Sequence, residues 1–233
     1  FLACDMILKG PAIIERSTSQ VVRSPISDPA SCGDPVLTSD ATRVFCNAYG
    51  RENQLGWQLW TYLRAGGAAT VITDQYNYNS PTVRPDNQRV AAAISGFKSG
   101  IGDMKLDGSD FRMLYTNANA QRAVRQPSYD RASTRVVFLE CGGPGPHGGL
   151  TLCDVYIVDA NGGAATRLTN TPGLKDGPVF SLDGSKIYYL QAESDRLQNI
   201  VELDIARQTT KVIATDIHEN DQVGVSGSQT LAL

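Results

Sequence analysis

A short phrase built around a proline recurs four times along the 233-residue chain and constrains its fold more than any other feature. The prolines lie 46, 46 and 51 residues apart; they are Pro35, Pro81, Pro127 and Pro178. A basic residue stands eight positions after each one, and an apolar run rich in β-forming residues follows; these basic residues are Arg43, Arg89, Arg135 and Lys186. Repeats of about 40–50 residues with several short strands each are typical of β-propellers. The sequence therefore predicts an all-β propeller with blades of four antiparallel strands.

Each repeat divides into four short strands, as the last full copy illustrates. Its proline-led strand, 178–181, is followed by a turn with Asp183-Gly184, which is a hairpin signal. The second, third and fourth strands are expected at 187–190, 200–203 and 211–214. Aspartates recur at the first turn, where they are expected to bond their own backbone; these are Asp40, Asp86 and Asp183. Aspartates also recur in the third strand and are expected to pair with the basic residue of the second; these are Asp5, Asp103 and Asp154.

The two ends of the chain look like complementary halves of one more blade. Segments 4–8 and 20–23 match the third and fourth strands of a repeat, and segments 223–226 and 230–233 match the first two. Pairing them would remove the open edges that an incomplete fan exposes. We therefore predict one domain, 1–233, with five blades at about 33–79, 80–125, 126–176, 177–221, and 222–233 joined to 1–32. The alternative is a fragment of a ring of six to eight blades.

Two segments resemble the repeat of TolB-type β-propellers. The first, residues 177–189, reads Gly-Pro-Val-Phe-Ser-Leu-Asp-Gly-Ser-Lys-Ile-Tyr-Tyr, and the second joins the Asp-Val-Tyr strand and Asn-Gly-Gly turn of 153–163 to Leu168-Thr169. Other copies depart from the pattern, with Asp40-Ala41 and Asp86-Asn87 in place of Asp-Gly and Ala132 in place of the aspartate. The resemblance implies a propeller of a kind that occurs in periplasmic scaffold proteins, lipoproteins, gating domains of serine peptidases and polysaccharide lyases. Fold alone does not choose among these.

The five cysteines predict two local disulfides and one spare thiol. Cys141 ends one strand and Cys153 begins the next, while Cys32 and Cys46 flank the first hairpin, so each pair can meet the short distance that a disulfide needs. Buried free thiols are the alternative. Disulfides would place the protein in an oxidising compartment. The spare Cys4 follows Phe1-Leu2-Ala3, which resembles the end of a lipoprotein signal, but a strand position is the preferred interpretation.

Charge and hydropathy exclude some partners and favour export. The formal charge is −3 and basic clusters are absent, which argues against nucleic acid and anionic membrane surfaces. No apolar run reaches the roughly 20 residues of a transmembrane helix. With the disulfides, these features predict an exported protein that is periplasmic, associated with the outer membrane or extracellular.

Candidate site residues gather on connections expected at the rim of the central channel. Tyrosines, arginines and polar residues there suit a protein or glycan partner, with ordinary loop composition as the alternative; they are Tyr76, Tyr78, Arg122, Arg125, His218 and Asp221. Three carboxylates, Asp34, Asp176 and Asp221, are weak candidates for holding Ca²⁺, and no other cofactor is indicated. No catalytic residue is predicted, because the segment Gly224-Val225-Ser226-Gly227-Ser228 lacks the final glycine of a nucleophile elbow.

These features favour a non-enzymatic binding or scaffold module. A carbohydrate-active enzyme, a lyase or glycosidase with its site at the channel mouth, is the first alternative. The second is a structural subunit of an extracellular assembly, since flat discs can stack and terminal half-blades can exchange between chains.

Overall fold

A computed structural model describes residues 2–4, 12–15, 20–23, 32–49, 56–73, 76–96, 98–119, 122–144, 150–194, 197–218, 224–225 and 231–232. All regular secondary structure in these residues is β-strand. The chain divides into two compact units, 1–113 and 114–233, with the boundary inside strand β11. Within the described residues, no helix is long and apolar enough to cross a membrane.

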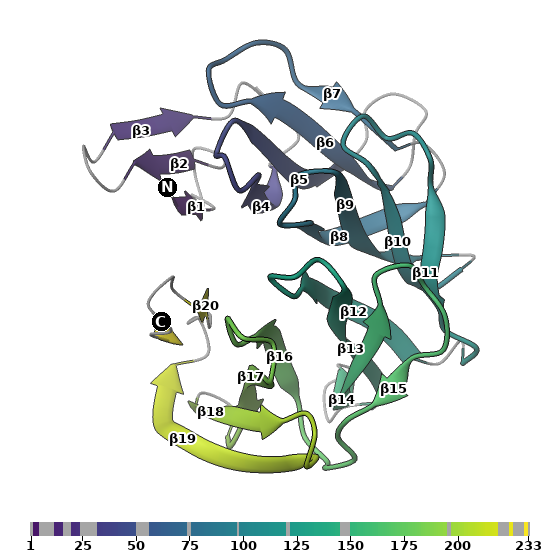
Figure 1. Cartoon of the computed structure of the whole chain (residues 1–233), viewed down its shortest axis with the longest axis vertical. Helices are drawn as coiled ribbons and strands as arrows, with labels where there is room; N and C mark the ends of the chain where they lie inside the picture. The colour runs from purple at the N-terminus through teal and green to yellow at the C-terminus, as the bar shows by residue number, and fades with distance from the viewer. Residues whose placement is uncertain are drawn as a thin grey trace. The chain divides into compact units, whose positions relative to one another are not determined.

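The first unit begins with a three-stranded sheet in the order β1-β2-β3, followed by the first two repeats (Figure 1). The first sheet comprises β1 (Leu2–Cys4), β2 (Ala12–Glu15) and β3 (Gln20–Arg23). The first repeat comprises β4 (Gly33–Leu37), β5 (Arg43–Tyr49), β6 (Trp57–Leu63) and β7 (Thr70–Val71). The second comprises β8 (Asn77–Val83), β9 (Arg89–Ser95), β10 (Gly100–Lys105) and β11 (Arg112–Thr116).

The second unit contains the third and fourth repeats and a terminal hairpin. The third repeat comprises β12 (Arg122–Tyr129), β13 (Arg135–Pro144), β14 (Leu150–Asp159) and β15 (Thr166–Arg167). The fourth comprises β16 (Lys175–Phe180), β17 (Lys186–Ala192), β18 (Leu197–Asp204) and β19 (Thr209–His218). The hairpin pairs β20 (Gly224–Val225) with β21 (Leu231–Ala232). In each repeat the strands pair in chain order and antiparallel, which confirms four strands per repeat.

The N-terminal sheet differs from the prediction. A strand that was not predicted, β2, lies between β1 and β3 and pairs with both, whereas 4–8 and 20–23 were expected to be direct neighbours. The apolar pair Ile13-Ile14 in β2 provides the missing strand, and residues 5–8 lie outside the described part of the chain. The single domain, the five blades and their closure into a ring stay predictions.

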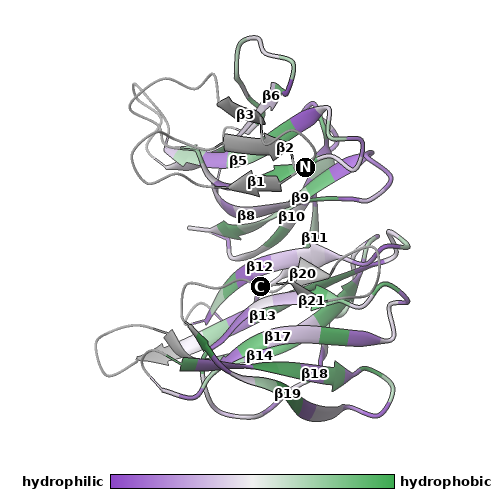
Figure 2. Ribbon diagram, turned by 90° about the vertical axis from the view of Figure 1, so that its left-hand side faces the viewer, coloured by the Kyte–Doolittle hydropathy of each residue, from purple (hydrophilic) through white to green (hydrophobic). Residues whose placement is uncertain are grey.

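The second strand is deeply buried in the first three repeats, whereas in the fourth repeat the second and third strands are buried to a similar degree. In β9, residues 90–94 are nearly inaccessible, and alanines there allow close approach of the neighbouring sheet. In the second unit, Leu139 and Val155 pack in one cluster with Ile187 and Tyr189 of the next repeat. In Figure 2 the apolar colour lies along parts of the strands, and the hydrophilic colour marks other parts of the strands and many of the turns. Hydrophobic burial between consecutive sheets therefore holds each unit together.

The predicted role of the turn aspartates is confirmed. Asp40, Asp86 and Asp183 each accept a hydrogen bond from the backbone N–H two residues later, at 3.0, 2.9 and 3.0 Å. Asp103 pairs with Arg89 as predicted, at 2.5 Å. The prediction for Asp154 is wrong, since it pairs with Arg167, while Arg135 pairs with Asp130. Arg135 lies directly opposite Asp159, and Asp159 is an odd number of residues from Asp154 along the same strand. The side chains of Arg135 and Asp154 therefore point to opposite faces of the sheet.

Both predicted disulfides are confirmed. Cys32–Cys46 joins the segment before β4 to β5, and Cys141–Cys153 joins β13 to β14. Their Cα atoms are 5.5 and 4.0 Å apart. Each disulfide therefore joins two segments of one repeat.

Candidate functional site

The first strand of every repeat is interrupted at its proline by a β-bulge. The register shifts between Gly33 and Val36 in β4, and at the equivalent point in the other three first strands. The residue before each proline takes a left-handed conformation; φ is 46° at Asp34, 48° at Ser80, 50° at Gln126 and 54° at Gly177. Three of the four are not glycine, and such a backbone costs about 1–3 kcal/mol per residue. We call these four positions the first-strand bulges.

Neighbouring bulges are linked by hydrogen bonds within each unit. In the first unit, the backbone N–H and the hydroxyl of Ser80 both donate to Asp34 Oδ2, each at 3.2 Å. In the second unit, the backbone N–H of Gly177 donates to Gln126 Oε1 at 3.1 Å and to Asp176 Oδ1 at 3.0 Å. The same position of consecutive repeats is therefore joined by a side chain from the earlier repeat.

The side chains at the bulges differ although the backbone repeats. Asp34 and Arg125 are exposed, and Asp176 and Gln126 are half-buried. A carboxylate, a hydroxyl and an amide thus stand at the left-handed positions, and the guanidinium of Arg125 lies one residue before one of them. This set can donate and accept hydrogen bonds, and it carries charges of both signs.

The two tyrosines proposed for the rim have different environments. Tyr78 is 3% exposed and packs in a core cluster with Phe45 and Ile94. Tyr76 is half-buried against the same cluster and stacks on Phe111, with ring centroids 5.8 Å apart. We therefore leave Tyr78 out of the candidate site, because its ring is occupied by packing between sheets.

Arg122 belongs to a buried ionic network. Its Nε lies 2.6 Å from Glu140 Oε1, and its Nη2 donates to the Glu140 backbone carbonyl at 2.7 Å. Asp154, 4% exposed, is shared by Arg122 at 3.5 Å and Arg167 at 2.7 Å. Burial, followed by the hydrogen bond that it donates to Glu140, raises the pKa of Tyr115. Arg122 therefore orders this network, and Arg125 is the more accessible of the two arginines.

The remaining predicted residues are only partly covered. His218 ends β19, and its side chain and Asp221 lie outside the described part of the chain. Asp34 and Asp176 belong to different units. Among the residues whose placement is described, no group of three or more His, Cys, Asp or Glu could hold a metal ion. Binding of Ca²⁺ stays a prediction.

One functional candidate escaped the sequence reasoning. Lys175 is 2% exposed, and its Nζ donates to the backbone carbonyls of Cys153 at 2.8 Å and Thr171 at 2.7 Å. Burial lowers the pKa of this amine, and the nearby charge of Asp154 partly opposes the effect. Lys175 stands three residues before its proline, where the other repeats have Cys32, Tyr78 and Val124. Aligning the repeats on their prolines would have exposed this break in the pattern.

No known family profile matches the sequence, and no curated protein matches it either. Solved structures do match. TolB from Acinetobacter baumannii has a TM-score of 0.69 and 18% identity, over 94% of this chain and 52% of its own. A TolB structure from Agrobacterium tumefaciens gives 0.68 and 14%, over 89% and 74%. An oligogalacturonate lyase in complex with manganese gives 0.66 and 10%, over 94% and 62%.

These similarities are similarities of fold alone. The chain has a TolB-type β-propeller fold, as the repeat pattern predicted. It spans about half the length of the Acinetobacter TolB chain and less than two thirds of the lyase chain.

Proposed function

We propose that this propeller is a non-enzymatic binding module that holds a partner protein at its first-strand bulges. The observation that carries the proposal is that one bulge recurs in four repeats and that three of its four left-handed positions carry unlike polar side chains, Asp34, Ser80 and Gln126. Asp, Ser and Gln occupy left-handed positions where glycine would be unstrained, so the strain supports a role for these side chains in addition to the hydrogen bonds that link neighbouring repeats.

The geometry suits an asymmetric chain as ligand. In a propeller the blades surround a central channel, and the first strand of each blade is expected to line it. The two linked bulges of each unit would then offer a rigid surface with a different contact at each position. An extended segment of a partner protein presents alternating donors and acceptors that such a surface can pair. The exposed Arg125 provides a charged anchor of a type enriched in protein interfaces.

Export is part of the proposal. Two disulfides persist where the surroundings are oxidising, and this supports a periplasmic, surface-bound or secreted location.

The test is site-specific photo-crosslinking in cells of the source organism. A photoreactive residue is placed at Arg125, next to a bulge, and in a second variant at Arg131, which is exposed in the turn at the other end of the same hairpin. We expect a discrete protein adduct from position 125, lost when Gln126 is changed to Ala, and none from position 131. Equal adducts from both positions, or none from position 125, would contradict the proposal.

A carbohydrate-active enzyme is the second candidate, because one end of the first repeat exposes an aromatic pair. Tyr49 and Trp57 are 47% and 38% exposed, and their rings meet edge to face with centroids 5.8 Å apart. Exposed aromatic faces suit stacking on sugars, and one matching fold is a lyase. Incubation with a polysaccharide panel should then release unsaturated or reducing ends, and Asp221→Asn should abolish the release. No release from any polymer sets this candidate aside.

A structural role in an assembly is distinguished from the binding module and from the enzyme by the size of the particles in solution. Sizing chromatography over a concentration series should show growing species if the chains stack or exchange strands. A constant monomer peak favours the binding module.

A further inference from the structure

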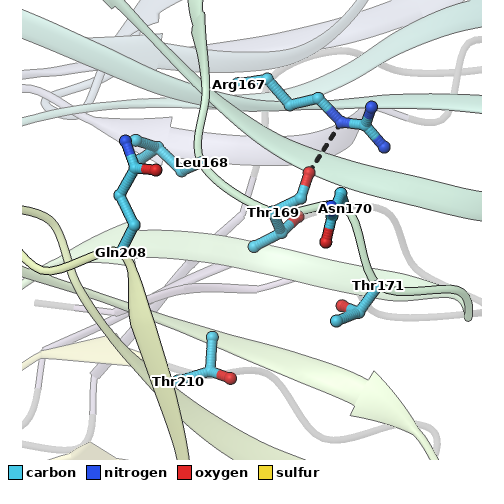
Figure 3. Close-up of a pocket in the computed structure, with 7 residues that line it drawn as sticks. All are labelled: Arg167, Leu168, Thr169, Asn170, Thr171, Gln208 and Thr210. Atoms are coloured by element: carbon cyan, nitrogen blue, oxygen red, sulfur yellow. Dashed lines mark hydrogen bonds between the residues drawn. The ribbon is translucent and has the colours of Figure 1, made fainter.

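A cavity of about 450 Å³ lies in the second unit, on the outer side of the third and fourth repeats (Figure 3). One wall is formed by the end of β15 and the segment that follows it, and the other by the turn from β18 to β19. Pockets for small molecules usually measure about 300–1,000 Å³. The cavity is separate from the first-strand bulges, so binding of a ligand there does not depend on the proposed function.

Neutral hydrogen-bonding side chains line both sides of the cavity. Asn170 and Thr171 lie on one side and Gln208 and Thr210 on the other, as Figure 3 shows. All four are exposed to solvent. Hydroxyl and amide groups both donate and accept hydrogen bonds, which matches a ligand that carries several hydroxyls. Among the described residues that line the cavity, none is acidic.

A fixed arginine adds a positive charge to the wall. Arg167 Nε donates to the Thr169 carbonyl at 2.7 Å, and Nη2 donates to the buried Asp154 at 2.7 Å. The side chain still has 48% of its surface exposed. Two of its five N–H groups are used in these bonds, so the guanidinium is held in place while part of it remains in contact with solvent. A preorganised guanidinium of this kind suits a carboxylate.

The charges behind the wall also favour an anion. Asp154 and Glu140 lie in contact with two arginines, Arg122 and Arg167. The buried Lys175 adds a third cation, whose Nζ donates to the backbone carbonyl of Thr171 in the wall. Because positive groups outnumber carboxylates in this network, an anionic ligand meets a favourable potential.

Gln208 breaks the pattern of the repeats at a cost in backbone strain. The turn between third and fourth strands uses glycine with positive φ in the first three repeats, at Gly66, Gly108 and Gly162. The fourth turn, 205–208, has no glycine, and Gln208 adopts φ 52°. Glycine would relieve that strain, whereas glutamine places an amide on the cavity wall. Strain retained on a cavity wall indicates use of the side chain.

We propose that this cavity binds a small polyhydroxylated carboxylate, a sugar acid, either free or as a unit of an acidic polysaccharide. Arg167 receives the carboxylate. Asn170, Thr171, Gln208 and Thr210 pair with the hydroxyls.

The test is isothermal titration calorimetry of the whole chain with D-glucuronate. We expect saturable binding that is at least about tenfold tighter than binding of D-glucose, which has the same ring without the carboxylate. Gln208→Gly and Thr171→Val should each weaken glucuronate binding about tenfold, the loss expected for one hydrogen bond. Gln208→Gly should also raise the thermal midpoint, so weaker binding cannot result from unfolding.

Ser133→Gly is the matched control, because Ser133 also has positive φ, at 61°, and does not line the cavity. It should raise the midpoint and leave binding unchanged. A tetramer of glucuronate distinguishes a free sugar acid from a polysaccharide as the ligand. Tighter binding of the tetramer per acid unit indicates the polysaccharide, and equal binding of tetramer and monomer indicates the free acid. Absence of saturable binding, equal affinity for D-glucose, or unchanged affinity in both cavity variants would overturn the proposal.

Discussion

The backbone N–H of Ser80 donates to the carboxylate of Asp34 across 3.2 Å, so two residues 46 positions apart join the same point of neighbouring repeats. Both residues have left-handed backbones, and the Ser80 hydroxyl donates to the same carboxylate oxygen. Each strained bulge is therefore supported by a contact from the adjacent repeat.

Asp34→Ala is expected to lower the free energy of unfolding by about 1 kcal/mol, because the two donors of Ser80 lose their acceptor. Asp34→Asn keeps an acceptor oxygen, so its loss of unfolding free energy should be smaller. Asp34→Gly removes the acceptor but relieves the left-handed backbone, so its loss should lie between those of Asp34→Asn and Asp34→Ala. Urea denaturation measures all three. Equal losses for Asn and Ala would show that the link does not stabilise the bulge.

Removing either disulfide should cost about 3 kcal/mol of unfolding free energy, the loop-closure value for short loops. The pairs are separated by 14 and 12 residues, so Cys32→Ala with Cys46→Ala and Cys141→Ala with Cys153→Ala should lose similar amounts. Urea midpoints in the oxidised state measure the loss, and dithiothreitol should lower the wild-type midpoint while leaving a variant that lacks both pairs unchanged. Non-reducing intact mass, four hydrogens below the fully reduced value, checks that both bonds are formed. A wild-type midpoint insensitive to dithiothreitol would refute this prediction.

Lys175 should make stability rise with pH. Burial lowers its pKa below 10.5, so between the folded-state pKa and 10.5 the unfolded chain binds more protons than the folded one. The stability difference between wild type and Lys175→Met should therefore shift in favour of wild type as pH rises from 7 towards 10.5. The shift is about 1.4 kcal/mol for each unit by which the folded-state pKa lies below 10.5.

Lys186 is the matched control for this experiment. Its side chain donates to Glu202 at 2.7 Å, and that hydrogen bond raises its pKa. Its contribution to stability is therefore present below pH 10.5 and is lost above that value, so Lys186→Met should show no shift in favour of wild type between pH 7 and 10.5. Parallel curves for wild type and Lys175→Met would mean that the Lys175 amine titrates normally.

Acid should weaken the turn at Asp183. The Ser181 hydroxyl, at 2.6 Å, and then the N–H and hydroxyl of Ser185 lower the pKa of Asp183 to about 2. The folded protein therefore holds this carboxylate ionised below the ordinary value of 3.8, and the stability gained is lost as pH falls from about 4 to about 2. NMR titration of the side-chain carboxyl measures the pKa directly. Ser181→Ala should move it upwards, and a wild-type value near 3.8 would disprove the assignment.

The fold was predictable because its signals are local. Each proline-led strand and each Asp-containing turn lies within a few residues of sequence, and the short apolar run that follows a turn is typical of a buried strand. The disulfide between Cys141 and Cys153 was predictable for the same reason, since these residues face each other across one hairpin.

The candidate site was less predictable because the bulges set which face each residue occupies. A bulge changes the register by one residue, and such a change reverses the direction of the side chains beyond it. Tyr78 lies three residues before its proline and is buried, as Val124 is at the same position, whereas Arg125 lies two residues before its proline and is exposed. The left-handed residues and register shifts that follow these positions carry no signal in the composition. The positive φ at Gln208 was equally hidden, because glutamine carries no signal for a left-handed backbone.

The position three residues before each proline is buried in all four repeats and is filled by Cys32, Tyr78, Val124 and Lys175. The same buried position is thus occupied by a disulfide-bonded cysteine, an aromatic ring, an aliphatic side chain and an amine in successive repeats. The repeats share a backbone conformation near this position, but the side chains that fill it differ in size and chemistry. Exchanging two repeats, or duplicating one, would place the residue at this position beside neighbouring residues that do not fit it. The contacts at this position therefore depend on the present order of the repeats.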